Sequence, residues 1–510
     1  MTRPAATPGL EEFLALARPG ALVPVALELP LDLDTPVTAF AKLADPPFGF
    51  LLESAEGGER WARYSFLGSS PREAWRLDGD RIRRWSPGAG WGDPEPTDDP
   101  FAAFERWIGR YEPAAPEGLP RFWGGAVGYF GYDTARWLER LPDAPPRDLE
   151  VPDACFMATD RVLILDNLHA TALAVRAVPI PGASRGDRAA LEALHAGAVD
   201  SLEEWTRRLA RPHGLAPLPA EGGEGVGARG NRTREDYEAA VGRIREYIAA
   251  GDAYQVVVSQ RASAPFDADP LTLYRALRQS NPSPYLFYID LDGVRLIGSS
   301  PETLVRVEDG EVTVRPIAGT RPRGRDPEED AAHERDLLAD EKERAEHLML
   351  VDLGRNDVGR VARPGTVRVP RFMTVERYSH VMHLVSEVTG ELRPEATAID
   401  AFRACFPAGT LTGAPKVRAM EIIDELEPTR RGPYGGAAGY VGYGARTLDM
   451  AIIIRTILAV EGEAHAQAGA GVVYDSDPGR EWEETRHKAR VLLQALSAVG
   501  AGRGAPGTPG

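Results

Sequence analysis

The spacing of hydrophobic and polar positions predicts many strands and few helices in the second half of the chain. Apolar residues at helical spacing follow Thr233, a candidate helix N-cap, and continue through Ile244 and Ile248. Runs rich in β-branched and aromatic residues, which are typical of strands, occur at 255–260, 288–297, 311–316, 435–443, 451–460 and 464–474. Because helices do not alternate strictly with these runs, we expect antiparallel sheet with helices on its outer faces, an α+β fold.

Two stretches are too poor in apolar residues to form part of a core. Residues 211–232 are dominated by Gly, Pro, Ala and charged side chains, which is typical of a linker. The last residues, 501–510, have a similar composition and are expected to fray. The predicted organisation is therefore an N-terminal region 1–210, a linker 211–232, a C-terminal region 233–500 and a disordered tail 501–510.

Composition places the chain among ordinary globular proteins. With 510 residues, 43% hydrophobic and 26% charged, it is long enough for two domains. A net charge of -17 disfavours nucleic acid as a partner, since phosphate contacts need a basic surface. The two cysteines, Cys155 and Cys405, indicate a reducing compartment, and no apolar stretch approaches twenty residues. We therefore expect a cytoplasmic protein that neither is secreted nor spans a membrane.

One short internal similarity stands out. The stretch Gly124-Gly-Ala-Val-Gly-Tyr-Phe-Gly-Tyr132 is nearly repeated at Gly435-Gly-Ala-Ala-Gly-Tyr-Val-Gly-Tyr443. Two glycine-rich strands packed closely against bulky groups explain it as well as a duplicated half-domain does. Both interpretations stay open.

Two Glu-x-x-Glu pairs are candidate metal ligands. Glu343 and Glu346, like Glu481 and Glu484, lie in segments rich in helix formers, so each pair shares one helical face. Like charges at this spacing repel by only about 0.2–0.5 kcal/mol, so an isolated pair is usually an ordinary solvated face. Four such carboxylates together suit Mg²⁺, which commonly bridges protein carboxylates to an anionic substrate.

Candidate anion-binding groups accompany these carboxylates. Gly319-Thr320 and Gly469-Ala-Gly471 offer backbone N–H groups that no side chain blocks, although each stretch alone is equally typical of a turn. Arg455 ends a strand-like run, Ile452-Ile-Ile-Arg455, and has the geometry to hold a carboxylate through two hydrogen bonds. The combination predicts a magnesium enzyme that acts on a small anionic substrate.

Longer motifs resemble those of the chorismate-utilising enzymes. They are Pro316-Ile-Ala-Gly-Thr320-Arg-Pro-Arg-Gly324, Glu346-His-Leu-Met-Leu-Val-Asp-Leu-Gly-Arg-Asn-Asp357, Gly409-Thr-Leu-Thr-Gly-Ala-Pro-Lys416 and Gln467-Ala-Gly-Ala-Gly471. The resemblance runs continuously over residues 233–496, and within the family it is strongest to the large (component I) subunits of anthranilate synthases. It implies two antiparallel sheets packed face to face with helices outside.

The resemblance also implies the binding residues. Mg²⁺ would be surrounded by Glu343, Glu346, Glu481 and Glu484, with Glu346 and Glu484 as direct ligands, and would hold the ring carboxylate of chorismate. The implied contacts to chorismate combine backbone donors with cationic side chains that suit a dianion. They are Gly319, Thr320, Thr410, Tyr434, Arg455, Gly469, Ala470, Gly471 and Lys488.

The implied reaction adds ammonia at ring C2 as the C4 hydroxyl departs, and then eliminates pyruvate. Glu302, in Ser300-Pro-Glu-Thr303, matches the family's general acid, and its pKa must be raised for that role. His383 matches the group that removes the C2 proton, and Thr410 completes the catalytic set. His347 and His380 are interpreted as packing or supporting groups.

Two further positions separate members of the family. Enzymes that add water carry a lysine base where this chain has Gln255, and 4-amino-4-deoxychorismate synthases carry a lysine nucleophile where it has Ala318. The remaining reaction is attack of ammonia at C2. It ends either in anthranilate, after elimination of pyruvate, or at the aminodeoxy intermediate, as in a 2-amino-2-deoxyisochorismate synthase. A catalytically inactive regulator or a scaffold would be expected to lose the catalytic residues, which this chain retains.

The resemblance extends to regulation and partners. Residues 51–54 and 60–65 resemble the tryptophan-sensing segment of the large subunits, and 281–286 its second part. Feedback inhibition by L-tryptophan is therefore expected at Glu53, Ser54, Pro284, Tyr285 and Leu286. Neither cysteine lies in a Gly-x-Cys-x-Gly context, so a separate glutamine amidotransferase subunit (component II) is expected to supply ammonia.

Overall fold

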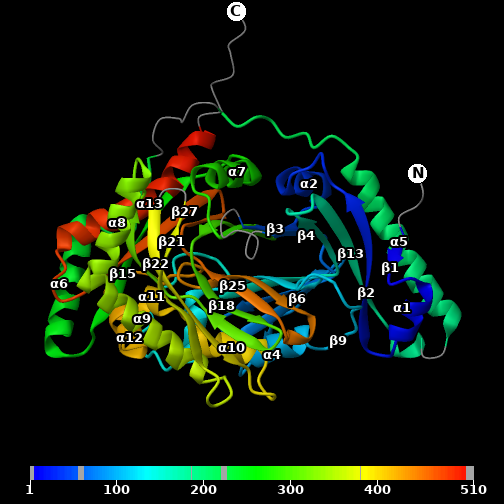
Figure 1. Ribbon diagram of the computed structural model, residues 1–510, viewed down its shortest axis with the longest axis horizontal. Helices are drawn as coiled ribbons and strands as arrows, with labels where there is room; N and C mark the ends of the chain where they lie inside the picture. The colour runs from blue at the N-terminus through cyan, green and yellow to red at the C-terminus, as the bar shows by residue number, and fades with distance from the viewer. Residues whose placement is uncertain (1–4, 55–62, 185–186, 220–226, 379–380, 501–510) are drawn as a thin grey trace, which may run out of the picture.

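The computed structural model describes residues 5–54, 63–184, 187–219, 227–378 and 381–500, and contains two large sheets with helices on their outer faces (Figure 1). With one exception, the short parallel pair β2–β9, the paired strands run antiparallel. The predicted α+β class is confirmed.

The first sheet has fourteen strands and joins the two halves of the chain at its centre. There β3 (Phe48–Glu53) pairs with β16 (Tyr285–Leu291), with Leu51 opposite Tyr288. Outward from β3 lie β4 (Tyr64–Ser69), β12 (Arg161–Asp166), β13 (Thr171–Pro179), β2 (Ala21–Pro30) and β1 (Ala6–Thr7), and β9 (Glu112–Pro113) pairs with β2. Outward from β16 lie β17 (Val294–Ser300), β26 (Thr456–Val460), β27 (Glu463–Val472), β15 (Gln255–Pro265) and β14 (Arg229–Gly230), and β23 (Gly413–Ala414) pairs with β15.

The second sheet has thirteen strands and is also built around a pair from the two halves. Its central neighbours are β10 (Gly125–Phe130) and β24 (Ala437–Gly442). Beyond β10 lie β11 (Ala154–Thr159), β5 (Glu73–Asp78), β6 (Arg81–Ser86), β7 (Gly90–Trp91) and β8 (Glu95–Pro96). Beyond β24 lie β25 (Leu448–Ile452), β18 (Thr303–Glu308), β19 (Glu311–Val314), β22 (Val381–Glu391), β20 (Ile317–Pro322) and β21 (Arg368–Arg377).

Four apolar clusters hold these layers together. Between the sheets, Phe50 and Phe66 of the first pack with Tyr129 and Tyr440 of the second. The outer face of the first sheet is covered by α1 (Leu10–Leu16), α2 (Pro36–Leu43), α5 (Arg188–Leu209), α7 (Pro270–Ser280) and α13 (Pro478–Gly500). The second is covered by α4 (Pro100–Ile108), α9 (Glu341–Gly359) and α10 (Ala398–Cys405), while α6 (Arg234–Ala250) and α12 (Lys416–Leu426) pack on β15.

The two halves follow the same path through both sheets. In the first sheet, β2, β13, β12, β4 and β3 of one half take the places of β15, β27, β26, β17 and β16 of the other. The repeated glycine stretches are β10 and β24, and Gly128 lies directly opposite its counterpart Gly439. A Cβ at either position would lie 2.0 or 2.1 Å from a backbone oxygen, of Cys155 or Asp449. Close packing and duplication therefore both explain the internal similarity.

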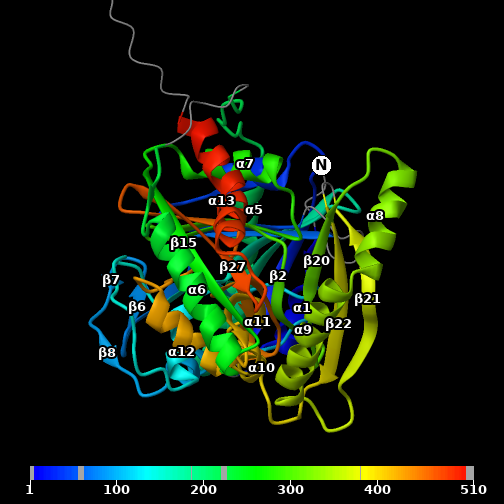
Figure 2. The same ribbon diagram turned by 90° about the vertical axis from the view of Figure 1, so that its left-hand side faces the viewer.

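The second half contains a segment with no counterpart of similar size in the first. Between β19 and β24, residues 317–391 contain β20, α8 (Pro327–Ala339), α9, β21 and β22, whereas in the first half β7, β8, α4 and β9 lie between β6 and β10. Figure 2 shows this segment beside α13 and α6, on the side that faces the viewer. The segment carries several of the predicted site residues.

Some predicted elements have different bounds. The run 288–297 is a hairpin, because Asp292 and Gly293 adopt positive φ values of 54° and 97° between β16 and β17. The run 451–460 divides between the two sheets, so Arg455 lies in the break between β25 and β26 instead of ending a strand. Within 211–232, Arg229–Gly230 forms β14, and residues 220–226, like the tail 501–510, lie outside the described residues.

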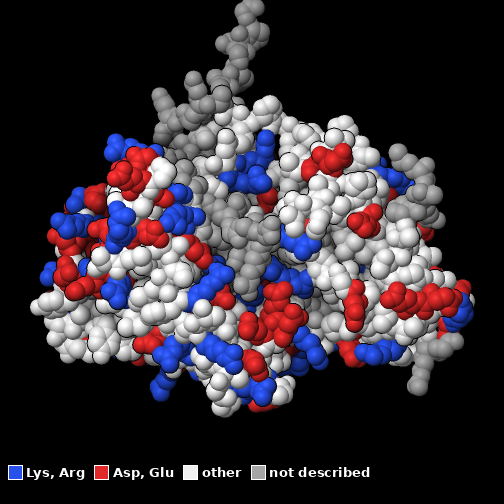
Figure 3. All heavy atoms as spheres, in the orientation of Figure 1, with Lys and Arg blue, Asp and Glu red and all other residues white. Residues whose placement is uncertain are grey.

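The surface carries charges of both signs. On the face of Figure 1, acidic and basic side chains are mixed over the part of the chain that the structure describes, without one continuous basic patch (Figure 3). Of the described helices, none is both long and apolar enough to traverse a membrane.

Candidate active site

A cavity of about 610 Å³ lies between α9 and β20 on one side and α13 and β27 on the other. Both helices begin at an acidic cap: the Asp340 carboxylate accepts hydrogen bonds from the N–H groups of Lys342 and Glu343, and that of Asp477 from Arg480. Residues predicted for the site line most of this cavity: Glu302, Gly319, Thr320, Glu343, Glu346, Thr410, Tyr434, Arg455, Gly469, Gly471, Glu481, Glu484 and Lys488.

The two carboxylate pairs face this cavity from opposite helices. On α9, Glu346 accepts a hydrogen bond of 3.1 Å from Gln255 Nε2. Glu343 lies 3.3 Å from the Nη1 atom of Arg321. Burial raises the pKa of Glu343, the charge of Glu346 adds to this effect, and Arg321 acts in the opposite direction. The carboxylates of α9 thus repel one another in a partly buried place.

On α13 the arrangement is similar. Burial raises the pKa of Glu481, and the charge of Glu484 adds to it, while a hydrogen bond from Ser476 opposes it. Lys488 Nζ lies 2.7 Å from Glu484 and donates to the carbonyl oxygen of Gly469 at 3.0 Å. Lys488 therefore joins α13 to the glycine-rich strand β27.

The chemistry of the donor set fits a hard divalent cation, because four carboxylates line one cavity and the two members of each pair repel one another. Their positions are not those of a closed metal site. Within the described ranges, no three His, Cys, Asp or Glu side chains come together closely enough to hold a metal ion. The pairs lie on separate helices and are engaged by Gln255, Arg321, Ser476 and Lys488.

Arg455 supplies a positive charge without a compensating anion. Its backbone φ of 50° lies in the left-handed region, which is uncommon for a residue with a side chain. Burial lowers its pKa. Among the described residues, none forms a hydrogen bond or ion pair with its guanidinium group. Because an uncompensated buried charge is costly, a strained Arg455 facing a cavity is typical of a site for an anionic ligand.

Glu302 lies where the two sheets approach the cavity. Thr410 Oγ1 donates a hydrogen bond of 2.9 Å to Glu302 Oε1. Burial raises the pKa of Glu302 to about 7, while the Thr410 hydrogen bond and the charge of Lys488 lower it. Near neutral pH this carboxyl group is therefore able to hold a proton and release it, as a general acid must.

Two predicted residues lie beside the cavity wall. Of the described residues assigned to catalysis or substrate binding, His383 and Ala470 are absent from the lining. His383 lies behind the wall, with Nδ1 2.9 Å from the Gly319 oxygen and 3.1 Å from Thr320 Oγ1. Ala470 is fully buried on β27, where alternation turns it away from the cavity between Gly469 and Gly471.

His347, by contrast, belongs to the core. It is fully buried, Nε2 lies 2.6 Å from Ser386 Oγ, and burial lowers its pKa to about 4. This agrees with the predicted packing role, whereas His380 lies outside the described residues.

Glycines make room for the functional groups. Gly319 has a φ of 65°, and a Cβ there would lie 2.9 Å from Leu337 and 3.3 Å from Glu343. A Cβ on Gly471 would lie 2.6 Å from the Gln255 amide nitrogen. The glycines therefore allow Glu343 and Gln255 to occupy their positions.

Some lining residues were not assigned from the sequence. Gln467 and Lys342 face the cavity, yet neither was given a role. Gln467 begins the motif Gln467-Ala-Gly-Ala-Gly471 and precedes Gly469 by two positions. Because alternate residues of a strand share a face, alternation would have placed Gln467 on the same face of the strand as Gly469. Lys342 had no comparable signal beyond lying beside Glu343.

A second, smaller cavity of about 50 Å³ contains the residues predicted to bind tryptophan. Glu53, Ser54, Pro284, Tyr285 and Leu286 all line it, with β24 and Asp449 on the other side. Tyr285 Oη donates to Asp449 Oδ1 at 2.9 Å and lies 2.9 Å from Thr303 Oγ1, next to Glu302. Glu53 is held by Tyr274 and Arg278.

Comparison with known proteins identifies the family. The profile of chorismate binding enzymes matches residues 50–494. The chain belongs to this family. It is 51% identical to anthranilate synthase component 1 of Pseudomonas aeruginosa over 96% of this chain and 98% of the relative, and 47% identical to that of Aquifex aeolicus over 96% and 97%. The resemblance found in the motifs is confirmed.

Solved structures of the family share the fold. Anthranilate synthase component I from Streptococcus pneumoniae superposes with a TM-score of 0.73 at 34% identity, covering 91% of this chain and 98% of the other. The menaquinone-specific isochorismate synthase of Escherichia coli gives a TM-score of 0.67 over 96% and 98%. At 19% identity, the second similarity concerns the fold alone.

Proposed function

We propose that this chain is the large subunit (component I) of an anthranilate synthase, which converts chorismate and ammonia to anthranilate and pyruvate. This reaction would be the first committed step of tryptophan biosynthesis. The observation that carries the proposal is the uncompensated Arg455 facing the same cavity as the raised-pKa acid Glu302. Relatives about half identical over nearly the whole chain bear that name, which supports the same assignment.

Arg455 is proposed to hold one carboxylate of chorismate. Its guanidinium offers two parallel N–H donors in a partly buried place, where a charge-assisted pair is stronger than in water. The backbone N–H groups of β27 and the Lys488 ammonium lie on the same cavity and suit the second anionic group. Binding a dianion would relieve the cost of burying Arg455 without a partner.

Glu302 is proposed to protonate the C4 hydroxyl as it leaves, which avoids expelling hydroxide. Burial raises the pKa of this carboxyl group to about 7. A general acid works best when its pKa lies near the operating pH. Thr410 fixes the direction of that carboxyl group through its 2.9 Å hydrogen bond.

His383 is proposed to take the C2 proton during elimination of pyruvate. The Gly319 carbonyl oxygen only accepts hydrogen bonds, so the 2.9 Å contact assigns the ring proton to Nδ1. In this tautomer Nε2 is the basic nitrogen. Since the ring lies behind Thr320, we propose that it reaches the substrate after a small movement of that wall.

Mg²⁺ is proposed as the cofactor, held by Glu346 and Glu484 with Glu343 and Glu481 beside them, and when bound it would hold the ring carboxylate of chorismate. Two neighbouring side chains would set the orientation of the proposed ligands. Gln255 orients Glu346, and Lys488 orients Glu484. Isothermal titration with Mg²⁺ tests the assignment, because Glu346→Gln should weaken metal binding even without chorismate.

Ammonia, not water, is the proposed nucleophile. Gln255 has no basic nitrogen to activate water, and its amide is engaged with Glu346. Ala318 cannot attack the ring. Because neither cysteine is exposed, with Cys155 and Cys405 both buried as free thiols, we propose that a separate glutamine amidotransferase subunit delivers the ammonia.

Feedback inhibition by L-tryptophan is proposed at the second cavity, lined by Ser54 and by Pro284 to Leu286. Its small volume means that an indole ring enters only if side chains rearrange. Such rearrangement would act on Tyr285, which is hydrogen-bonded beside Glu302. Titration calorimetry with L-tryptophan tests the site directly.

The function is tested with the purified chain, chorismate, Mg²⁺ and an ammonium salt. Anthranilate fluorescence and pyruvate are expected together in equal amounts. Chorismate consumed without pyruvate would instead support a 2-amino-2-deoxyisochorismate synthase. Untouched chorismate would overturn the enzymatic proposal, and glutamine turnover by this chain alone would overturn the need for a partner subunit.

A further inference from the structure

A buried ion pair lies beneath the cavity and has no part in the chemistry described so far. Arg431 and Glu427 expose only 1% and 3% of their side chains. Arg431 Nη2 lies 2.7 Å from Glu427 Oε1, and Nε lies 2.9 Å from Oε2. A buried pair of this kind contributes little net stability relative to apolar side chains, so the groups that it holds in place are of interest.

The remaining donors of Arg431 reach the helix that carries Thr410. Nη1 donates to the carbonyl oxygen of Leu411 at 2.7 Å, and Nη2 to that of Val257 at 2.9 Å. Leu411 belongs to α11 (Gly409–Thr412), a single turn with no side-chain cap at its start. So short a helix is not stable alone, and its last carbonyl groups have no partner within it. Arg431 supplies one of the missing donors.

Glu427 reaches a different wall of the cavity. Its Oε1 accepts hydrogen bonds of 2.8 Å from both the backbone N–H and the hydroxyl group of Ser259. The same hydroxyl oxygen accepts a 2.8 Å bond from Gln467 Nε2, and Gln467 lines the cavity. The ion pair is therefore bonded to α11, which carries Thr410, and to Ser259 of β15, whose hydroxyl group in turn holds the Gln467 side chain of β27.

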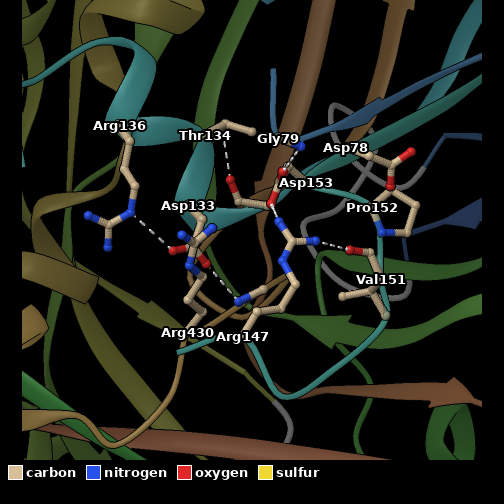
Figure 4. Close-up of polar contacts among 12 residues, drawn as sticks. Asp78, Gly79, Asp133, Thr134, Arg136, Arg147, Val151, Pro152, Asp153 and Arg430 are labelled. Atoms are coloured by element: carbon tan, nitrogen blue, oxygen red, sulfur yellow. Dashed lines mark hydrogen bonds and ion pairs between the residues drawn. The ribbon is translucent and has the colours of Figure 1, made fainter. Parts of the chain in front are cut away.

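The N-terminal half fixes the segment that contains Arg431 from outside. The Gly432 N–H donates to Asp133 Oδ2 at 3.0 Å, and its carbonyl accepts from the Tyr132 N–H at 2.8 Å. Arg431 itself lies over the Tyr132 ring, 4.5 Å from its centre. Figure 4 shows Asp133 between Arg136 and Arg430 on this side. The position of Arg431 is thus determined from both halves.

We propose that Arg431 is a positioning residue, which with Glu427 holds α11 so that Thr410 meets the carboxyl group of Glu302. The inference rests on the proposed function, because Glu302 and Thr410 act in that reaction. Arg431 touches neither the cavity nor the substrate. Its influence on turnover therefore passes through the Thr410 hydroxyl group.

A double-mutant cycle tests this coupling, with Arg431→Lys and Thr410→Val made singly and together. Lysine keeps the charge but cannot reach Glu427, Leu411 and Val257 at once. With chorismate, Mg²⁺ and ammonium, Arg431→Lys should lower kcat by about tenfold, the factor for one lost hydrogen bond to a charged group. In the Thr410→Val background the same change should lower kcat less than about twofold, because the group it positions is gone.

The pH profile is a second readout that a purely structural role would not move. The Thr410 hydrogen bond and the Lys488 charge both favour ionised Glu302. Losing the Thr410 contact should shift the basic limb of kcat/KM to higher pH in Arg431→Lys, while Lys488 is unchanged. Arg430→Lys is the matched control, since Arg430 Nε donates to the Pro145 carbonyl at 3.2 Å, and it should leave kcat and the limb unaltered.

Losses that multiply in the double mutant, together with an unmoved basic limb, would overturn the inference. If Arg431→Lys does not fold, Glu427→Gln replaces it in the cycle, because an amide keeps the shape and the bond from Ser259. Wild-type protein that leaves chorismate untouched would refute the proposed function itself, which separates the two failures.

Discussion

Arg455 is a half-buried arginine for which the described residues provide no ion-pair partner. Arg431 meets Glu427 and Arg306 meets Asp449, whereas Arg455 faces the cavity. From the sequence, Arg455 was predicted to bind a carboxylate, and that role stays a prediction. The sequence did not reveal the absence of a partner, which depends on every segment that packs nearby, nor the left-handed backbone that turns the residue out of its strand.

Replacing this residue should separate stability from function. Arg455→Met removes a half-buried charge that has no ion-pair partner among the described residues, so the free energy of unfolding without ligand should rise by about 1 kcal/mol. The same change should raise KM for chorismate by about a hundredfold, since a charge-assisted contact is lost. Chemical denaturation and steady-state kinetics measure the two effects. Arg306→Met is the control and should destabilise, because it leaves Asp449 buried without its 2.6 Å partner. Loss of stability in Arg455→Met would contradict this account.

Glu302 gives a pH dependence with a defined sign. Burial raises the pKa of Glu302 from 4.5 in the unfolded chain to about 7. Between these values only the unfolded chain has released the proton, so stability falls as pH rises from about 4.5 to about 7. Glu302→Gln abolishes that fall, and its advantage in urea denaturation over the wild type should be larger at pH 8 than at pH 5.

The activity should also depend on the protonation of Glu302, and the protonated form should be the active one. Because the proposed role of Glu302 is that of a general acid, kcat/KM should decline as pH rises above about 7, and Glu302→Gln should lower it by about 10²–10⁴-fold. A Glu302→Gln variant with wild-type turnover would remove Glu302 from the mechanism. Equal stability gains at both pH values would show that the carboxyl group is ionised in the folded protein.

At the scale of elements, helices were predicted better than strand ends. The carboxylate-bearing segments form α9 and α13 as their spacing indicated, and α6 begins at the predicted cap, Thr233. The runs 288–297 and 451–460 each proved to be two strands. Strands buried on both faces are apolar throughout, so periodicity does not mark where the chain turns or changes sheet.

Strand β16 links the second cavity to Glu302, the proposed general acid. Its first residue, Tyr285, lies 2.9 Å from Thr303 Oγ1 on β18, immediately after Glu302. Burial raises the pKa of Tyr285 to about 12, so the hydroxyl group stays protonated and bonded. If tryptophan acts through this contact, Tyr285→Phe should keep kcat within about twofold and raise the concentration for half-inhibition at least about tenfold, as expected from one lost hydrogen bond.

Comparing Tyr285→Phe with the wild type requires a measurement of L-tryptophan binding in addition to the inhibition curve. Calorimetry should show that Tyr285→Phe still binds L-tryptophan, since the ring remains in the cavity wall. Tyr288→Phe is a matched control on the same strand, because Tyr288 packs in the cluster beneath α7 and should leave inhibition unchanged. Undiminished inhibition in Tyr285→Phe would exclude this contact as the route.

At the scale of the whole molecule, the duplicated path explains why one half alone has this active site. Both halves supply equivalent strands to each sheet, but only the second contains residues 317–391, which bring Gly319, Thr320, Glu343 and Glu346 to the cavity. The short glycine repeat hinted at duplication. Strand order is set by contacts between distant segments, so the sequence pattern did not predict that β3 pairs with β16 and β10 with β24.

This shared construction predicts that the regions on either side of residues 220–226 do not fold separately. Each half lacks the partner of its central strands, and the cluster between the sheets takes Phe50, Phe66 and Tyr129 from one half and Phe287 and Tyr440 from the other. The intact chain should therefore unfold in one cooperative transition, while fragments divided between residues 219 and 227 should each lack one.

Mixing the two fragments should restore the transition and, with chorismate, Mg²⁺ and ammonium, part of the turnover. Calorimetry of each fragment, of the mixture and of the intact chain measures this directly. A Gly125→Ala version of the first fragment is the matched control, because its Cβ would lie 2.1 Å from the Val441 carbonyl oxygen across the central pair β10–β24. Reassembly should then be lost. A cooperative transition in either fragment alone would instead mean that the chain consists of two independent domains joined by a linker, whose sheets meet only after each has folded.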